Sequence, residues 1–279
     1  DNSSSTYNDT VIASNAANAT TKNWKVQYYS NDADIPATTG TYVCGTPHPV
    51  DTSRYITLTV SNGEVIKLDF KAAAANTSVR IKSGITDTTI TVGTSWKGIT
   101  SYTAADSVMT VYGDIIVFYC SNNRAKLTAI DLSHNTQLTE LYCTNNKITS
   151  LDVSNNTQLT GLDCSYNQLT ALDVSNNTQL TWLYCNKNNL SHLGISKNTA
   201  LAQLWCTDNQ LTNLDISKNT KLMILGIWGN KFSTATLDAI YCQIPDRTGQ
   251  QRKGFILPLH ETSPATEQNN VNATNAKNA

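Results

Sequence analysis

The sequence has few charges, few histidines and no long apolar run. Only 15% of its 279 residues are charged and the formal net charge is −1, so it offers no broad basic surface for a polyanion. No apolar run approaches the roughly 18 residues that a membrane-spanning helix needs. The four histidines share no repeating position, and a glycine-rich phosphate loop and a G-x-S-x-G motif are both missing. The sequence therefore predicts no enzyme, no cofactor, no nucleic acid partner and no insertion of this chain into a membrane.

One phrase recurs from about residue 115 to residue 232. It repeats every 21 residues, and its marker cysteines are Cys143, Cys164, Cys185 and Cys206. One further step falls on Ile227, an apolar substitute. An upstream copy containing Cys120 has two extra residues, which brings the count to six copies.

Each copy reads L-x-x-L-x-C-x-x-N-x-L, which is the pattern of a leucine-rich repeat. A copy of this length cannot bury its own apolar face, so the copies must stack and the leucines form one continuous core. The Leu-x-Cys step predicts a short strand whose middle residue points outward. The following asparagine predicts a ladder of buried amides that bond the turn backbone. The Leu-Asp-Val-Ser half is too polar for a helix and predicts an extended or turn-like back wall.

Two side-chain columns within the repeat invite a chemical interpretation. The cysteine slot accepts Ile227, so we interpret it as a column of small buried groups rather than a redox or metal site. A stacked aspartate column could suggest calcium, but Gly194 interrupts it and the glycine-rich calcium repeat is missing, so hydrogen bonds to the turn backbone are favoured. The column consists of Asp131, Asp152, Asp173 and Asp215. Cys44 and Cys242 lie outside the ladder, and the sequence leaves their state open.

Residues 25–114 alternate apolar with polar residues between Gly, Asn, Asp and Ser turns, which predicts a small antiparallel, immunoglobulin-like β-sandwich. The predicted strands are Lys25–Tyr29, Tyr55–Val60, Val65–Phe70, Ser78–Ile81, Thr88–Val92 and Val108–Tyr112. Because the last strand leads directly into the repeats, we expect this domain to cover the open end of the coil. The predicted fold is mainly β: a sandwich followed by a leucine-rich-repeat solenoid over 115–232.

The two ends of the chain are polar. Residues 1–24 predict a polar, helical segment, and 262–279 a polar tail. Between the repeats and the tail, residues 233–261 predict a C-terminal cap, with a helix that begins at Ser233 or Thr234 and a strand at Gly254–Pro258. The Ala/Asn-rich stretches at both ends agree in sequence, which indicates one unit of a longer tandem protein; the alternative is a pair of low-complexity linkers.

The repeat phrase, the Tyr-Gly-Asp strand before it and the cap containing Arg-Thr-Gly resemble the leucine-rich-repeat surface proteins of Bacteroides-type gut bacteria. They are also broadly similar to internalins. The resemblance covers most of 24–279. It implies export, often as a surface lipoprotein, and recognition of another macromolecule, with no catalytic residues. A lipoprotein cysteine is not found near the start of this sequence.

Aromatic side chains recur at the outward position between Leu and Cys. Tyr and Trp dominate binding hot spots, and a line of them on the order of 20 Å long predicts a binding surface on the concave sheet. The predicted binding residues are Tyr119, Tyr142, Trp182, Tyr184, Trp205 and Trp228. The alternative is that aromatic residues simply suit a strand surface.

Three functions compete for this surface. A protein or peptide ligand would pack on the rings, with a polar rim formed by Glu140, Asp163, Gln203 and Asp208. A glycan would lay its sugar faces on the same rings. A structural spacer would need length and no aromatic line. The sequence favours an extracellular or cell-surface protein that binds a protein or peptide.

Overall fold

The computed structural model describes residues 49–246 and 254–257. The chain divides into two compact units, Asp1–Pro49 and Val50–Ala279, and every element described below belongs to the second. The expectations for residues 1–24, for a strand at Lys25–Tyr29, for Cys44 and for the tail 262–279 lie outside the described residues.

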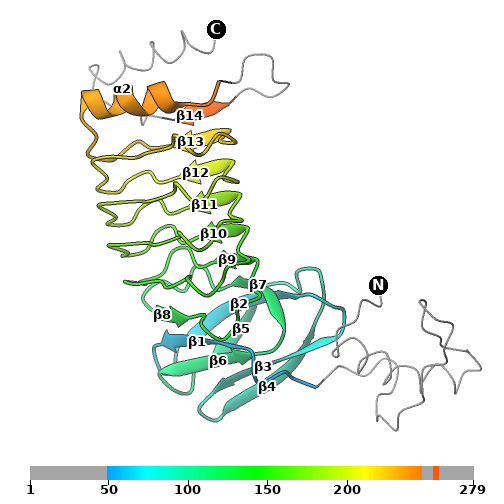
Figure 1. The fold of residues 1–279 in the computed structure, drawn as a ribbon. Helices are drawn as coiled ribbons and strands as arrows, with labels where there is room; N and C mark the ends of the chain where they lie inside the picture. Colours follow the sequence, from blue (N-terminus) through cyan, green and yellow to red (C-terminus); the bar gives the residue numbers. More distant parts are fainter. Residues whose placement is uncertain (1–48, 247–253, 258–279) are drawn as a thin grey trace, which may run out of the picture. The chain divides into compact units, whose positions relative to one another are not determined.

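Two sheets carry the fold of the described residues (Figure 1). The smaller sheet is antiparallel throughout. Its order is β4 (Thr86–Val92), β3 (Thr77–Ser83), β6 (Val108–Tyr112), β1 (Tyr55–Val60) and β8 (Leu127–Asp131). The strands predicted around residues 55–60, 78–81, 88–92 and 108–112 are therefore present.

The larger sheet has nine strands. It is parallel from β14 to β7, and its last two pairings, β7 with β2 and β2 with β5, are antiparallel. Its order is β14 (Phe255–Leu257), β13 (Ile224–Gly226), β12 (Gln203–Trp205), β11 (Trp182–Tyr184), β10 (Gly161–Asp163), β9 (Glu140–Tyr142), β7 (Ile115–Tyr119), β2 (Val65–Ala72) and β5 (Thr100–Thr103). The sequence did not predict β5, a four-residue strand with little apolar content.

The predicted sandwich and the solenoid are not separated at residue 114. Strand β2 pairs with β7 of the first repeat, and β8 of the same repeat pairs with β1. Both sheets therefore contain strands from before and after residue 114, and the strands of the predicted sandwich cover the open end of the coil by pairing with the first repeat. The physical reason is that β7 alone would present an unpaired edge of N–H and C=O groups, which β2 satisfies.

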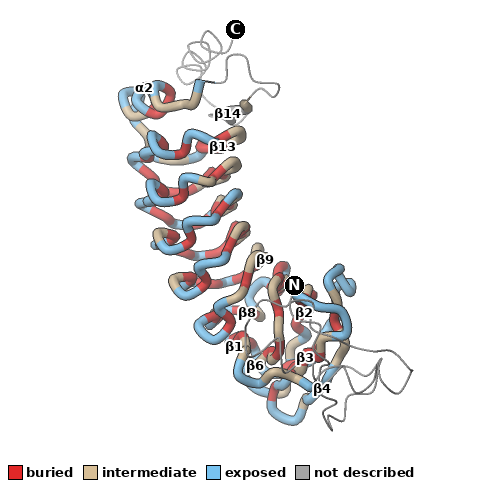
Figure 2. The backbone as a smooth tube through the Cα atoms, turned by 45° about the vertical axis from the view of Figure 1, so that its right-hand side comes forward, coloured by how far each residue is buried: buried red, intermediate tan, exposed pale blue. Residues whose placement is uncertain are grey.

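The core is one continuous cluster that runs from the first sheet through every turn of the coil. In Figure 2, buried and exposed segments alternate in each turn. The central leucines of β9 to β12 have no exposed surface, nor do the five ladder cysteines, and Ile227 is 1% exposed in the same slot. Burial raises the pKa of these thiols, that of Cys206 to about 12. The ladder thiols are therefore neutral at ordinary pH, as buried structural cysteines are.

The predicted asparagine ladder is confirmed. Asn167 donates from Nδ2 to the carbonyls of Cys143 and Cys164, at 2.9 and 3.0 Å. Its Oδ1 accepts from the N–H of Ile148 at 3.1 Å. Each amide thus joins two successive rungs and leaves none of these backbone groups unpaired. The same pattern recurs at Asn188, Asn209 and Asn230.

The first ladder asparagine bonds to the cap instead of to an earlier repeat. Asn123 Oδ1 accepts from the N–H of Lys67 at 2.7 Å, and Asn123 Nδ2 donates to the Lys67 carbonyl at 3.0 Å. Lys67 belongs to β2, so this cap strand supplies the backbone groups that a preceding rung would otherwise offer.

The back wall contains a second ladder of buried asparagines, which was not predicted from the sequence. Asn177 Nδ2 donates to the carbonyls of Val153 and Asn156, at 2.9 and 2.8 Å. The same donation occurs at Asn156, Asn198 and Asn219, and the buried Asn135 supplies a backbone carbonyl to Asn156. Their spacing of 21 residues was the available signal.

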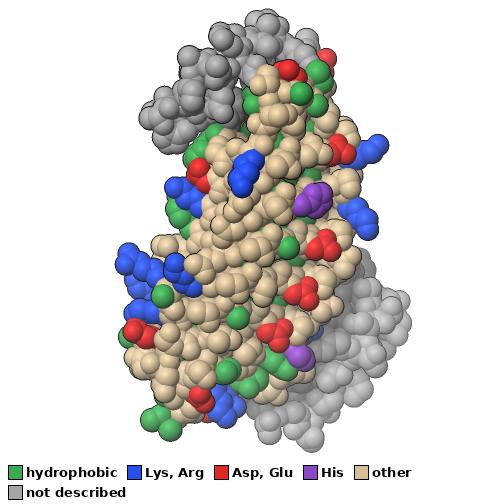
Figure 3. Space-filling view, turned by 90° about the vertical axis from the view of Figure 1, so that its left-hand side faces the viewer, with side chains coloured by type: hydrophobic (Ala, Val, Ile, Leu, Met, Phe, Trp, Pro, Cys, Tyr) green, Lys and Arg blue, Asp and Glu red, His purple; other side chains and the backbone are tan. Residues whose placement is uncertain are grey.

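The aspartate column has the predicted structural role. Asp152 Oδ1 accepts from the N–H of Ser154 at 2.9 Å, and the same bond occurs at Asp131, Asp173 and Asp215. Acidic side chains follow one another along one margin of the back-wall face in Figure 3, most of which is uncharged and polar. Among the described residues, no group of three or more His, Cys, Asp or Glu side chains could hold a metal ion.

The C-terminal cap consists of α2 (Thr234–Gln243) and β14. Ser233 is the N-cap, as predicted, and its hydroxyl accepts from the N–H of Thr236 at 3.1 Å. Gln243 Oε1 accepts from the N–H of Ile216 at 2.8 Å, which ties the helix to the preceding turn. In the part of the chain that the structure describes, no helix is long and apolar enough to cross a membrane.

The ladder cysteines give a stability test. Cys164→Ser should lower the free energy of unfolding by about 1–3 kcal/mol, because it buries a hydroxyl where a thiol packs among apolar groups. Urea unfolding in a reducing buffer measures the change. Cys242 is exposed, so Cys242→Ser should change stability by less than about 0.5 kcal/mol. A neutral Cys164→Ser variant would count against a buried ladder.

Candidate recognition surface

The outward face of the solenoid sheet is defined by the residues on either side of each buried leucine. In β9, β11 and β12 the central residue is buried while both neighbours remain partly exposed. Parallel pairing places equivalent positions side by side, as with Tyr184 and Trp205. Side chains on adjacent parallel strands lie about 4.8 Å apart, so two outward columns run along the coil.

Six aromatic rings make an unbroken set of contacts on this face. Successive ring centroids from Tyr119 to Trp205 are separated by 6.4, 5.4, 5.2 and 6.5 Å, and Trp96 lies 6.4 and 5.9 Å from the first two rings. These distances are typical of offset and edge-to-face aromatic pairs. We call this set the aromatic row, and its members are Trp96, Tyr119, Tyr142, Trp182, Tyr184 and Trp205.

Five of the six predicted binding residues belong to the aromatic row. The sixth, Trp228, follows β13 and is half-buried, and the row described above ends at Trp205. Trp96 was not predicted, because it lies in the loop between β4 and β5, outside the repeat pattern. It is 41% exposed, and the Lys71 ammonium lies 4.5 Å from the ring centroid. Tertiary structure alone brings it to Tyr119 and Tyr142.

Strand β10 has no aromatic residue on its outward face, where Gly161 and Asp163 lie. Gly161 leaves room for an aromatic ring from the next strand. A Cβ atom added at Gly161 would overlap the indole ring of Trp182. The ring therefore lies over the glycine, from where it contacts both Tyr142 and Tyr184. Gly226 has a related role, since a Cβ there would lie 3.0 Å from Cε3 of Trp205.

Asp163 places a carboxylate among these rings. Its Oδ1 accepts from the N–H of Ser165 at 3.1 Å, and it forms no ion pair with any described residue. Burial raises the pKa of Asp163, and burial together with Asp163 raises the pKa of Tyr184. Burial therefore disfavours the ionised form of Asp163 on this face.

Two row tyrosines are held by neighbours on the same strand or the next one. The Tyr142 hydroxyl donates to Glu140 Oε2 at 2.7 Å, and the Tyr184 hydroxyl donates to Gln203 Oε1 at 2.5 Å. Burial, followed by the bond to Glu140, raises the pKa of Tyr142. Both rings are thus fixed and neutral, and they present their faces rather than a titrating group.

Comparison with known proteins supports the assignment of the repeats. Residues 136–177 match the family described as Leucine Rich repeats (2 copies). The match assigns leucine-rich repeats to residues 136–177, and the stacked Leu-x-Cys rungs that follow continue the same pattern. Among curated proteins, none matches the chain.

Several solved structures are similar in part. A structure described as the functional domain of InlJ from Listeria monocytogenes, which includes a cysteine ladder, is 29% identical over 54% of this chain, with a TM-score of 0.44. The internalin inlF of the same species is 30% identical over 36% of this chain, with a TM-score of 0.33. Internalin C2 is 20% identical over 53% of this chain and 80% of its own, with a TM-score of 0.37. This chain spans only 36% of the InlJ structure and 32% of the inlF structure.

The fit of Trp182 over Gly161 can be tested by one methyl group. Gly161→Ala should destabilise the protein by about 1–3 kcal/mol, because the added atom displaces the indole ring. Gly194→Ala is the control, since its Cβ would lie 3.6 Å from His192 Nε2, an ordinary contact, and should change stability by less than about 1 kcal/mol. Urea unfolding compares the two. Equal effects would contradict the described packing.

The raised pKa of Asp163 predicts a specific dependence on pH. Folding favours the protonated form, so ionised Asp163 weakens the fold at neutral pH, and Asp163→Asn should raise the melting temperature at pH 7. The gain should disappear as the pH falls through the raised pKa towards about 3.9, the ordinary aspartate value.

Asp173→Asn is the matched control for this pH dependence. Hydrogen bonds from Ser175 lower the pKa of Asp173, so its ionised form stabilises the fold above the ordinary pKa, and this stabilisation is lost on acidification. Asp173→Asn should therefore not raise the melting temperature at pH 7. Melting curves of both variants from pH 3 to pH 8 measure the difference, and gains of equal size would contradict it.

Proposed function

We propose that this protein is a non-catalytic recognition protein that binds a protein or peptide partner on the outward face of the solenoid sheet. The observation that carries the proposal is the aromatic row. Its rings stay partly exposed in the folded chain, although contact between large aromatic groups and water is energetically unfavourable. A partner that covers the rings would bury this apolar surface, which favours binding.

The class of the protein supports the same proposal. Leucine-rich-repeat proteins typically mediate recognition between proteins. In this chain, the carboxylate of Asp163 lies between the rungs of Tyr142 and Tyr184. An Arg or Lys side chain of a partner could stack on the rings and pair with that carboxylate. The proposed binding residues are the aromatic row and Trp228, with Asp163 as the charged centre.

A glycan is the second candidate, because sugar faces also stack on Tyr and Trp rings. Sugar hydroxyls, however, need many polar partners in fixed positions. On this face, Glu140 and Gln203 already accept hydrogen bonds from Tyr142 and Tyr184. Fewer polar groups are therefore left to receive a glycan, which favours a protein or peptide. A bare spacer would not account for the aligned rings.

The site of action that we propose is outside the cell, as an exported or surface-bound protein in adhesion or host interaction. The low charge and the Asn- and Thr-rich repeats support it, together with the resemblance to Bacteroides-type surface proteins and internalins. Lipid anchoring and the Bacteroides-type assignment are parts of this proposal that depend on sequence resemblance alone.

A triple variant tests the binding face. Changing Tyr142, Tyr184 and Trp205 together to Ser should abolish binding in an array of extracellular proteins and glycans, while the buried core keeps the fold. Far-UV circular dichroism and thermal melting check the fold. Tyr166→Ser is the control, since this ring is 49% exposed and lies outside the aromatic row.

Each outcome of the array bears on the proposal. Hits on proteins that are lost in the triple variant and kept in Tyr166→Ser would support it. Hits only on glycans would move the assignment to the second candidate. Unfolding of the triple variant would mean that the rings serve stability instead of binding.

A further inference from the structure

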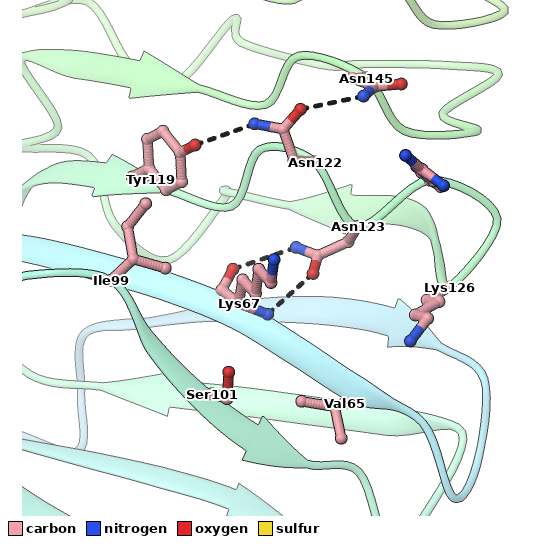
Figure 4. A pocket seen from close by; sticks show the side chains of 10 residues that line it. Val65, Lys67, Ile99, Ser101, Tyr119, Asn122, Asn123, Lys126 and Asn145 are labelled. Atoms are coloured by element: carbon pink, nitrogen blue, oxygen red, sulfur yellow. Dashed lines mark hydrogen bonds between the residues drawn. The ribbon is translucent and has the colours of Figure 1, made fainter.

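A groove of about 820 Å³ lies where the cap meets the first repeat, next to one end of the aromatic row. Its walls come from β2, from the start of β5, from the end of β7 and from the turn that follows β7 (Figure 4). The residues on which its chemistry depends are Val65, Lys67, Ile99, Tyr119, Arg124 and Lys126.

The groove carries an excess of positive charge. Lys67, Arg124 and Lys126 line it, and none of the described lining residues is acidic. Lys126 Nζ pairs with Glu64 at 2.7 Å, whereas Lys67 and Arg124 form no ion pair with a described carboxylate. The whole sequence has a net charge of −1, so the excess of positive charge is confined to the surroundings of the groove. An anionic ligand would complete the charge balance.

The groove also offers apolar contact. Ile99 is 57% exposed and Val65 is 41% exposed, and the ring of Tyr119 forms part of the same wall. Figure 4 shows Ile99 near Tyr119, with Val65 and Ser101 along the opposite side of the groove. A sulfated sugar has little apolar surface to place against these side chains. A peptide that combines carboxylates with an apolar residue matches both features.

The backbone around the groove is fixed before any ligand arrives. Asn123 holds the β2 backbone at Lys67 through the two hydrogen bonds drawn in Figure 4. Arg124 follows directly and has a φ of 54°, in the left-handed region that a bulky residue seldom adopts. It belongs to the first repeat, the copy with two extra residues. Positive φ recurs in the later turns at Asn145, Tyr166, Lys187 and Asp208, so it belongs to the turn geometry of the repeats.

We propose that this groove binds an acidic peptide segment in which Asp or Glu side chains flank an apolar residue. The carboxylates pair with Lys67 and Arg124, and the apolar side chain packs on Ile99 beside Tyr119. Charge complementarity selects the ligand and the two exposed aliphatic side chains distinguish a peptide from a polyanionic sugar. The groove acts independently of Tyr184 and Trp205, which lie on later rungs.

The test is fluorescence anisotropy with the whole chain and a fluorescein-labelled peptide of two leucines flanked on each side by three glutamates. The double variant Lys67→Gln/Arg124→Gln should bind at least tenfold more weakly than the parent chain. Lys197→Gln/Lys221→Gln removes the same charge from exposed positions outside the groove and should bind as the parent does. Binding of the parent should also weaken as salt rises.

Two further variants separate binding from folding. Arg124→Gly removes the charge from a backbone position that suits glycine, so it should keep or raise the melting temperature while it weakens peptide binding. Ile99→Ser should weaken binding without loss of charge. The Tyr142/Tyr184/Trp205 triple variant should bind this peptide normally, so a failure of the groove proposal is distinguishable from a failure of the proposed function.

Three outcomes would overturn the proposal: no binding by the parent chain, equal loss in both double variants, or tighter binding of a heparin-derived oligosaccharide than of the peptide. The third result would assign the groove to a sulfated glycan.

Discussion

The whole coil depends on one interaction, the buried asparagine amide that bonds the backbone of two successive rungs. Each 21-residue turn contains only one short strand. The backbone N–H and C=O groups of its bends therefore need hydrogen-bond partners from side chains. Asn167, between the carbonyls of Cys143 and Cys164 and the N–H of Ile148, satisfies three of them at once. A second ladder lies on the back wall, where Asn177 Nδ2 donates to the carbonyls of Val153 and Asn156. Because each ladder includes bonds to the preceding rung, neighbouring turns stabilise one another.

The same requirement explains the two ends of the described fold. The first rung has no repeat before it, and β2 takes that place by antiparallel pairing and through the bonds between Lys67 and Asn123. At the other end, β14 pairs with β13, and Gln243 bonds to the N–H of Ile216. The two caps differ in sequence from the repeats, but they supply the hydrogen bonds that a further repeat would supply at each end.

The hydrogen bonds of the interior do not involve the side chains at the outward positions of the strands, so these positions can vary from rung to rung. The strand pairing brings Tyr142, Trp182 and Tyr184 to within ring contact, and the missing side chain at Gly161 lets the row continue past Asp163. The junction with the cap adds Trp96 to one end of the row and forms the basic groove. The aromatic row and the basic groove therefore lie on the repeats and where the repeats meet the cap.

The sequence by itself determined the solenoid, the cysteine and asparagine ladders, the capping helix after Ser233 and five members of the aromatic row. Equivalent positions of successive repeats have the same surroundings, so the spacing of residues alone identifies inward and outward positions. Only the tertiary structure decided how the strands before residue 114 divide between two sheets, that Trp96 joins the aromatic row, and that Lys67 and Arg124 share a groove. These features depend on contacts between segments that are distant in the chain. The periodicity of the sequence does not predict which strand pairs with the edge of the first rung.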